Sequence, residues 1–415
     1  MAPIVDACWS HDGEFLLTAS TDQTARIFSK FRKRDSDSRL TDTWCELARP
    51  QVHGHDFSCL ALVPYRKACD KDEVLYVYAS GSEEKVIRIF ESPETFLDTL
   101  QIAKGRDTVI ARTRKSFLGA TLPALGLSNK AIIQEEEQKA SLADNNDQGY
   151  SDGADLAPMS LPSVVFAPPL EEHLSQNTLW PETHKLYGHG NDLYCICSDI
   201  SGKYIASACR AQSQATAGII VWSTETWSKC CTLECHSLTV TQLVFSPCGS
   251  FLASVGRDRK IGVHQKVGDA KIFLTRSTIK GHPRIIWSAD WSPDSKYLAT
   301  GSRDSKIRIW QLNDGLLQEN HLLEVSCESS VQAVSFCRKG NSTLLAAGFE
   351  DGSIKIFEFI TQGDIQLIEK FRGPPWDIHA ASVRRVCWKP NHGSMAEPCV
   401  LASVGDDHSV KIWNI

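Results

Sequence analysis

Short apolar stretches separated by polar turns recur along most of the chain. Within Arg284–Trp310, IIWSADW is typical of a strand, and Ser292-Pro-Asp-Ser295 is a turn with proline in its favoured place. KYLATGS follows as a second strand, and the polar turn Arg303–Lys306 separates it from IRIW. These stretches are mostly apolar, as expected of strands buried on both faces. No segment shows a convincing apolar 3.6-residue period, so we predict antiparallel sheet with very little helix.

A fixed spacing of rings and acids divides the chain into repeats. Trp291, Asp304 and Trp310 lie 13 and 6 residues apart, and this spacing recurs elsewhere. Seven units end at Phe28, Phe90, Trp222, His264, Trp310, Phe357 and Trp413. Several of them open with a histidine, at Gly54-His55, Gly188-His189, His236, Gly281-His282 and His379. Such repeats are typical of the WD repeat, whose blade is a four-stranded antiparallel sheet.

Residues 91–180 lack the repeat pattern. Removing these 90 residues leaves 325, or about 46 for each of seven units, close to the roughly 40–45 residues of one blade. We therefore predict an all-β fold, one seven-bladed WD-repeat propeller over residues 1–415, with a long insertion between the second and third units. Within the insertion, residues 134–155 carry seven acids against one base, which predicts a disordered loop. A partner-binding acidic segment is the alternative.

The two chain ends leave one blade short of a strand. The first unit starts directly at its inner strand, Ile4–Trp9, and the last stops at Ile415, two residues after Trp413. In a WD repeat the outer strand comes from the segment before the next Gly-His. An unclosed blade would expose a strand edge. We therefore expect the chain to be N-terminally incomplete.

Histidine, hydroxyl, acid and tryptophan recur together in the repeats. The clearest set is His282, Thr300 or Ser302, Asp304 and Trp310, and the last unit offers His379, Asp407 and Trp413. A buried histidine can donate to an aspartate in the tight turn, while a hydroxyl and the indole N–H complete the network. A Ser/His/Asp hydrolase is the alternative. Because the same residue types recur at the same repeat positions, we interpret the sets as structural.

Basic residues concentrate in the turns of the fourth and fifth units. They are Arg257, Arg259, Lys260, Arg284, Arg303 and Lys306, and we call them the basic surface. In a propeller these turns open on one face, and adjacent blades bring them together. The other equivalent positions read Thr21, Glu83, Glu350 and Asp406. The surface is a candidate site for an acidic protein segment or for RNA phosphates, with the former slightly favoured. A solvated face offset by Asp258 and Asp304 is the alternative.

Composition narrows the class of protein. With 44 Lys+Arg against 50 Asp+Glu and a net charge of −6, a strongly basic nucleic-acid protein is excluded. The fifteen cysteines form no C-x-x-C pair and fit buried, reduced thiols of a cytoplasmic or nuclear protein. No apolar run approaches the roughly 18 residues of a membrane helix. The sequence holds no Gly-rich phosphate loop, H-E-x-x-H or cluster-binding cysteine triplet, so we predict no catalytic, cofactor or metal site.

Segments between the repeats carry a more specific signal. They are Leu122–Ile132, Gln176–Glu182, Lys185–Gly190, His236–Pro247 and Arg284–Tyr297. In this order they resemble the second-subunit family of the Elongator complex. The resemblance runs from about Ile4 to Trp413 and corresponds to the C-terminal half of that family.

The resemblance implies a function that composition does not. Members of that family have two consecutive seven-bladed propellers and serve as non-catalytic core subunits of a complex that modifies the wobble uridine of tRNA. Catalysis belongs to a subunit with radical S-adenosylmethionine and acetyltransferase-like domains. This chain would connect that subunit with the large scaffold subunit, in the cytoplasm and nucleus, with at most a weak tRNA contact. A generic WD-repeat peptide-binding adaptor is the second interpretation, and an enzyme is the third.

Overall fold

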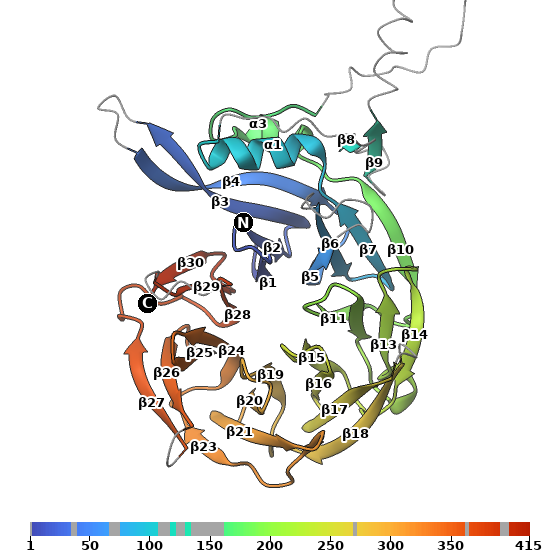
Figure 1. Cartoon of the computed structure of the whole chain (residues 1–415), viewed down its shortest axis with the longest axis vertical. Coiled ribbons are helices and arrows are strands. Elements are labelled where there is room, and N and C mark those ends of the chain that lie inside the picture. Colours follow the sequence, from blue (N-terminus) through green and yellow to red (C-terminus); the bar gives the residue numbers. More distant parts are fainter. Residues whose placement is uncertain are drawn as a thin grey trace, which may run out of the picture.

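Seven antiparallel sheets surround a central axis, which confirms the predicted seven-bladed propeller (Figure 1). The computed structural model describes residues 2–34, 40–65, 75–106, 117–121, 129–133, 162–268, 272–361, 365–390 and 398–415. The first strand of each blade lies nearest the centre, and the last described strand lies at the rim.

The blades follow one another in chain order. Blade one contains β1 (Ile4–Trp9), β2 (Leu16–Ser20), β3 (Thr24–Arg34) and β4 (Leu40–Val52). Blade two contains β5 (Phe57–Tyr65), β6 (Leu75–Ser82), β7 (Val86–Glu91) and β10 (Glu182–Tyr187). Blade three contains β11 (Leu193–Ser198), β12 (Tyr204–Cys209), β13 (Ile219–Ser223) and β14 (Ser228–Leu233), with the short helix η1 (Gln214–Thr216) before β13.

The remaining blades repeat this plan with small differences. Blade four contains β15 (Val240–Phe245), β16 (Phe251–Gly256), β17 (Lys260–Val267) and β18 (Ile272–Lys280). Blade five contains β19 (Ile286–Trp291), β20 (Tyr297–Ser302), β21 (Lys306–Asn313), β22 (Leu316–Leu317) and β23 (Leu323–Ser326). Blade six contains β24 (Val331–Lys339), β25 (Ser342–Phe349), β26 (Ile354–Ile360) and β27 (Gln366–Arg372). Blade seven contains β28 (Val383–Trp388), β29 (Val400–Gly405) and β30 (Val410–Asn414).

Blade seven therefore has three strands among the described residues, and β30 forms its outer edge. The expected upstream segment that would supply a fourth strand stays a prediction.

Indole N–H groups of the inner strands connect each of three blades to the blade before it. The Nε1 of Trp291 donates to Val244 O at 3.2 Å, and that of Trp388 donates to Ser335 O at 2.9 Å. The Nε1 of Trp9 donates to Cys387 O at 3.1 Å, across the junction of blades one and seven. These bonds combine a large apolar ring in the core with a satisfied polar atom.

The insertion lies between β7 and β10, inside blade two. Its described elements are α1 (Glu94–Ala103), the paired strands β8 (Phe117–Thr121) and β9 (Lys130–Ile133), and α3 (Glu171–Gln176). In α1 the buried Phe96, Leu97, Leu100 and Ala103 share one face, so the expectation that no segment has a helical period is wrong here. Phe96 packs on Phe15 of blade one and on Trp180, the last residue of the insertion. The predicted disordered stretch, residues 134–155, lies outside the described residues.

Candidate functional site

The polar network of blade five uses Thr300, not Ser302. The Nδ1 of His282 is 2.9 Å from Asp304 Oδ2, and its Nε2 is 2.8 Å from Thr300 Oγ1. The indole N–H of Trp310 donates to the same Thr300 oxygen at 2.9 Å. Burial lowers the pKa of His282, so the neutral ring donates at Nδ1 and accepts at Nε2. Every member of this buried chain therefore has a partner.

Ser302 has a different task in the same turn. Its hydroxyl donates to Ile285 O at 2.8 Å, and it accepts the Asp304 N–H at 3.3 Å. The Asp304 carboxylate also accepts the N–H of Lys306 at 3.1 Å. Between them Ser305 adopts a left-handed conformation with φ 60°. The network thus fixes a strained turn whose flanking residues face solvent.

Blade seven repeats the arrangement with a serine that sequence reasoning did not name. His379 Nδ1 lies 2.9 Å from Asp407 Oδ1, and its Nε2 lies 2.8 Å from Ser403 Oγ. Trp413 donates its indole N–H to Ser403 at 2.9 Å. Ser403 occupies the repeat position of Thr300, so the repeat alignment contained the signal that identifies it. The side chains of His379 and Ser403 are buried, which fits a structural role rather than an exposed nucleophile.

The other blades keep only part of the set. In blade two His53, not the expected His55, contacts the acid, with its Nε2 3.1 Å from Glu84 Oε1. In blade three His189 and Trp222 meet at Ser207, each at 2.8 Å, and no described carboxylate contacts the histidine. Burial accordingly lowers the pKa of His189 to about 4.

Blade four replaces the terminal tryptophan with His264 and places Cys235 beside it. The Cys235 Sγ lies 3.8 Å from His264 Nε2 and 3.8 Å from Ser254 Oγ. In blade three the equivalent residue is Gly188, where an added Cβ would lie 3.0 Å from the Trp222 ring. Because the imidazole of His264 is smaller than an indole, blade four has room for a cysteine at position 235 where blade three has a glycine.

One repeated backbone hydrogen bond aligns the face that carries the basic surface. In every blade, the residue after β2 or its counterpart donates its N–H to the carbonyl just before the first strand, at 2.8 to 3.0 Å. The seven donors are Thr21, Glu83, Arg210, Arg257, Arg303, Glu350 and Asp406. Sequence reasoning missed Arg210, because the Arg210–Ala217 interruption hides its repeat position when units are aligned on their last ring. Alignment on the strand ends SAC, SVG and TGS identifies it.

The structure brings the arginines of the basic surface to this face but gives the two lysines partners. Arg257, Arg259, Arg284 and Arg303 are exposed and have no ion pair with a described residue. Lys306 instead forms an ion pair with Glu324 of β23, and the Lys260 ammonium donates to Cys235 O at 3.4 Å. Asp258 and Asp304 are committed to His236 and His282. Uncompensated positive charge on this face therefore resides in the four arginines and in Lys260, whose carbonyl acceptor is neutral, while Lys306 is paired with an acid.

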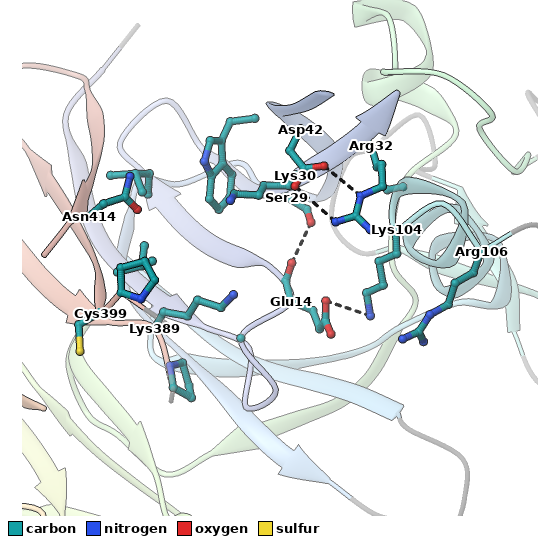
Figure 2. A pocket seen from close by; sticks show the side chains of 17 residues that line it. Glu14, Ser29, Lys30, Arg32, Asp42, Lys104, Arg106, Lys389, Cys399 and Asn414 are labelled. Atoms are coloured by element: carbon teal, nitrogen blue, oxygen red, sulfur yellow. Dashed lines mark hydrogen bonds and ion pairs between the residues drawn. The ribbon is translucent and has the colours of Figure 1, made fainter. Parts of the chain in front are cut away.

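A separate pocket of about 550 Å³ lies where blades one and seven meet beside α1 (Figure 2). Most of its charges are already paired: Lys104 contacts Glu14 at 3.0 Å, and Arg32 contacts Asp42 at 3.0 Å. Figure 2 also shows the Ser29 hydroxyl, which donates to Glu14 O at 2.8 Å. The lining contains no histidine, so it offers no imidazole base for nucleophilic chemistry.

Within the described ranges, no three His, Cys, Asp or Glu side chains form a group suited to a metal ion. In the same part of the chain, no helix has the length and apolar character needed to cross a bilayer.

Blade number, repeat spacing and the His–hydroxyl–Trp networks define a WD-repeat β-propeller protein. The family model "WD domain, G-beta repeat" matches residues 2–29, 180–213, 227–264, 274–311 and 375–414. Over its whole length the chain is a homologue of Elongator complex protein 2. It is 36% identical to the rat and human proteins over 99% of the chain, and 35% identical to the Arabidopsis thaliana protein over 100%. The chain spans about half the length of these curated relatives, 50–52%.

Proposed function

We propose that the chain is a non-catalytic scaffold subunit of an Elongator complex that supports modification of the wobble uridine in tRNA. The observation that carries this proposal is the 35–36% identity to Elongator complex protein 2 over nearly the whole chain. The geometry agrees, because the His/hydroxyl/acid sets are buried and hold turns. The partners would be the large scaffold subunit and the catalytic radical S-adenosylmethionine/acetyltransferase-like subunit, in the cytoplasm and nucleus.

Affinity purification from the source cells tests this proposal. The tagged chain should recover the other Elongator subunits in fixed proportion, and its depletion should lower the modified fraction of wobble uridine measured by nucleoside mass spectrometry. Recovery of unrelated proteins without those subunits would instead favour a peptide-binding WD-repeat adaptor outside tRNA modification. Turnover by the purified chain alone would contradict a scaffold.

We further propose that the basic surface docks a sister subunit, with tRNA as the second candidate. The support is the set of exposed arginines without described acid partners, beside aspartates committed to histidines. The test is the pair Arg257→Glu with Arg303→Glu. A docking surface predicts lower subunit recovery, whereas a phosphate-binding surface predicts weaker tRNA binding with a flatter salt dependence.

A matched pair keeps this test specific. Arg276→Glu with Arg338→Glu makes the same charge change at exposed arginines outside the basic surface. If the folded Arg257/Arg303 variant assembles and binds tRNA as well as this control does, the basic surface is only solvated.

A further inference from the structure

The pocket where blades one and seven meet beside α1 has more bases than acids in its lining. The basic side chains are Lys30, Arg32, Lys104, Arg106 and Lys389, and the acidic ones are Glu14 and Asp42. Both acids are already paired, Glu14 with Lys104 and Asp42 with Arg32. The other three bases have no ion pair with a described acid. The pocket therefore carries uncompensated positive charge.

The three unpaired bases come from separate parts of the chain. Lys30 belongs to β3 of blade one, Lys389 follows β28 of blade seven, and Arg106 follows α1 of the insertion. All three side chains are at least partly exposed. In Figure 2 the Lys389 side chain extends from the side of blade seven toward the middle of the lining residues. Like charges brought together in this way repel one another, and a bound anion would relieve the repulsion.

Lys389 occupies a repeat position that has a different task in other blades. Its N–H donates to Val400 O at 2.8 Å, at the start of the second strand, and the equivalent residues make the same backbone bond. In four blades the side chain at this position also accepts a backbone N–H, at 2.8 to 3.1 Å; these residues are Ser10, Asp199, Ser246 and Ser292. An ammonium group only donates, so Lys389 cannot hold the turn in this way. Blade seven thus has a positive charge where the other four have an acceptor.

The stem of Lys389 is held across the junction of the two blades. A Cβ added at Gly13 of blade one would lie 2.7 Å from Lys389 Cε and 3.1 Å from its Cγ. Gly13 has φ 71°, so glycine suits both the backbone conformation and the close contact. A lysine whose stem is already packed loses less conformational freedom when its ammonium binds a ligand.

Apolar side chains complete the lining. They are Trp44, Pro390, Pro398, Val400 and Ile412. The Lys30 Nζ lies 5.9 Å from the centre of the Trp44 ring, so charge and ring adjoin. The volume of about 550 Å³ falls within the roughly 300–1,000 Å³ of small-molecule sites, which combine apolar walls with a few placed polar groups. The pocket therefore has room for the organic part of a ligand beside the three bases.

We propose that this pocket binds a small organic molecule that carries two or more phosphate groups. The phosphates would bind Lys30, Arg106 and Lys389, and the organic part would contact Trp44 and Ile412. The inference goes beyond the proposed scaffold function and does not rest on it. The blade turns that line the pocket follow the inner strands, whereas the basic surface lies where those strands begin.

Ligand binding to the purified full chain tests the inference. The probe is ATP without divalent cations, followed by isothermal titration calorimetry in low salt. Adenosine, which lacks the phosphates, and inorganic tripolyphosphate, which lacks the organic part, are the comparison ligands. ATP should bind at one site and more tightly than either, and added salt should weaken it. ATP should also raise the melting temperature, because a ligand of the folded state stabilises that state.

Lys389→Ser is the most informative variant, because serine is the residue at this position in blades one, four and five. The variant should fold normally and bind ATP about tenfold more weakly. Lys30→Gln should weaken binding by about threefold to tenfold. The matched control is Lys296→Ser, which removes an exposed lysine from the turn after β19, outside the pocket, and should leave the dissociation constant unchanged.

Four results would overturn the inference. They are the absence of saturable ATP binding by the wild-type chain, equal ATP affinity of the wild-type chain and folded Lys389→Ser, adenosine binding as tight as that of ATP, and tripolyphosphate binding as tight as that of ATP. The docking test is separate, because Arg257→Glu with Arg303→Glu changes no residue of the pocket lining.

Discussion

The carboxylate of Asp6 in blade one accepts a hydrogen bond from the guanidinium Nε of Arg385 in blade seven, at 2.7 Å. Asp6 is buried, and its second oxygen accepts the N–H of Leu60 in blade two at 3.0 Å. A single side chain therefore connects the first blade to both of its neighbours. The Trp9 indole makes a second polar contact across the junction of blades one and seven.

Removing this carboxylate should destabilise the ring. Asp6→Ala leaves Arg385 without its acid and the Leu60 N–H without its acceptor, so we expect a loss of about 3 kcal/mol in the free energy of unfolding. Denaturant titration measures it. Asp42→Asn, which breaks the exposed Arg32–Asp42 pair, is the control and should cost under about 1 kcal/mol. Equal losses in the two variants would mean that Asp6 does not hold the ring closed.

Thr300 should contribute more than Ser302 to the free energy of unfolding, because it holds the polar network of blade five. Thr300→Val keeps the side-chain shape but deprives the Trp310 N–H and the His282 ring of their shared oxygen, at a cost of about 2 kcal/mol. Ser302→Ala removes one bond to Ile285 O and should cost about 1 kcal/mol. The exposed Thr278→Val serves as the reference. A larger loss for Ser302→Ala would contradict the network as described.

His189 should make the protein sensitive to mild acid. Its pKa lies at about 4 in the folded chain and near 6.5 when unfolded, so below pH 6.5 the unfolded state binds more protons. Stability should fall as the pH drops from 6.5 to 4, by an amount on the order of 3 kcal/mol from this residue. His189→Gln should show a smaller decrease over the same range of pH. Parallel curves of melting temperature against pH would refute this assignment.

Cys235 should react faster with iodoacetamide than the buried thiols do. Burial raises the pKa of Cys235, but hydrogen bonds and charge from His236 and His264 outweigh it and lower the pKa to about 6. Burial instead raises the pKa of Cys59 and Cys387 to about 12. Peptide mass spectrometry at pH 7 should find Cys235 alkylated early, together with the exposed Cys248.

A variant that removes one of the two histidines provides the control for the labelling experiment. His264→Gln should slow alkylation of Cys235 and leave Cys248 unchanged, because Cys248 contacts Ser246 rather than a histidine. If Cys248 slows equally, or if Cys235 is unaffected, the imidazole does not activate the thiol.

Repeat spacing predicts the blades because each unit needs the same ring, acid and turn to pack against its neighbours. It leaves Thr300 and Ser302 unresolved, because residues two apart share one face of a strand. It also cannot show that Lys306 meets Glu324, since that pair depends on the return path of β23. The sequence does not predict the helix α1, because its short apolar pattern is similar to that of the buried strands around it.

Arg257 illustrates the same limit at the candidate site. The repeat predicts that Arg257 lies in a polar turn. It does not predict that the side chains of Tyr194 in blade three and Trp287 in blade five lie beside the Arg257 guanidinium, 5.8 and 5.9 Å from it, because that depends on how the blades are arranged around the axis. Alignment of the units on their strand ends predicts the position of Arg210 from the sequence alone.

The insertion inside blade two has a consequence for how the chain acquires its shape. The edge strand β10 is separated from its partner β7 by 90 residues, the largest sequence separation between two paired strands of one blade. Such distant pairing forms slowly, and blade two should be the last to complete its sheet. The entropy of closing a loop grows only with the logarithm of its length, so further residues there add little cost. Residues added at the outer rim of blade two would therefore leave the basic surface of blades four and five unchanged.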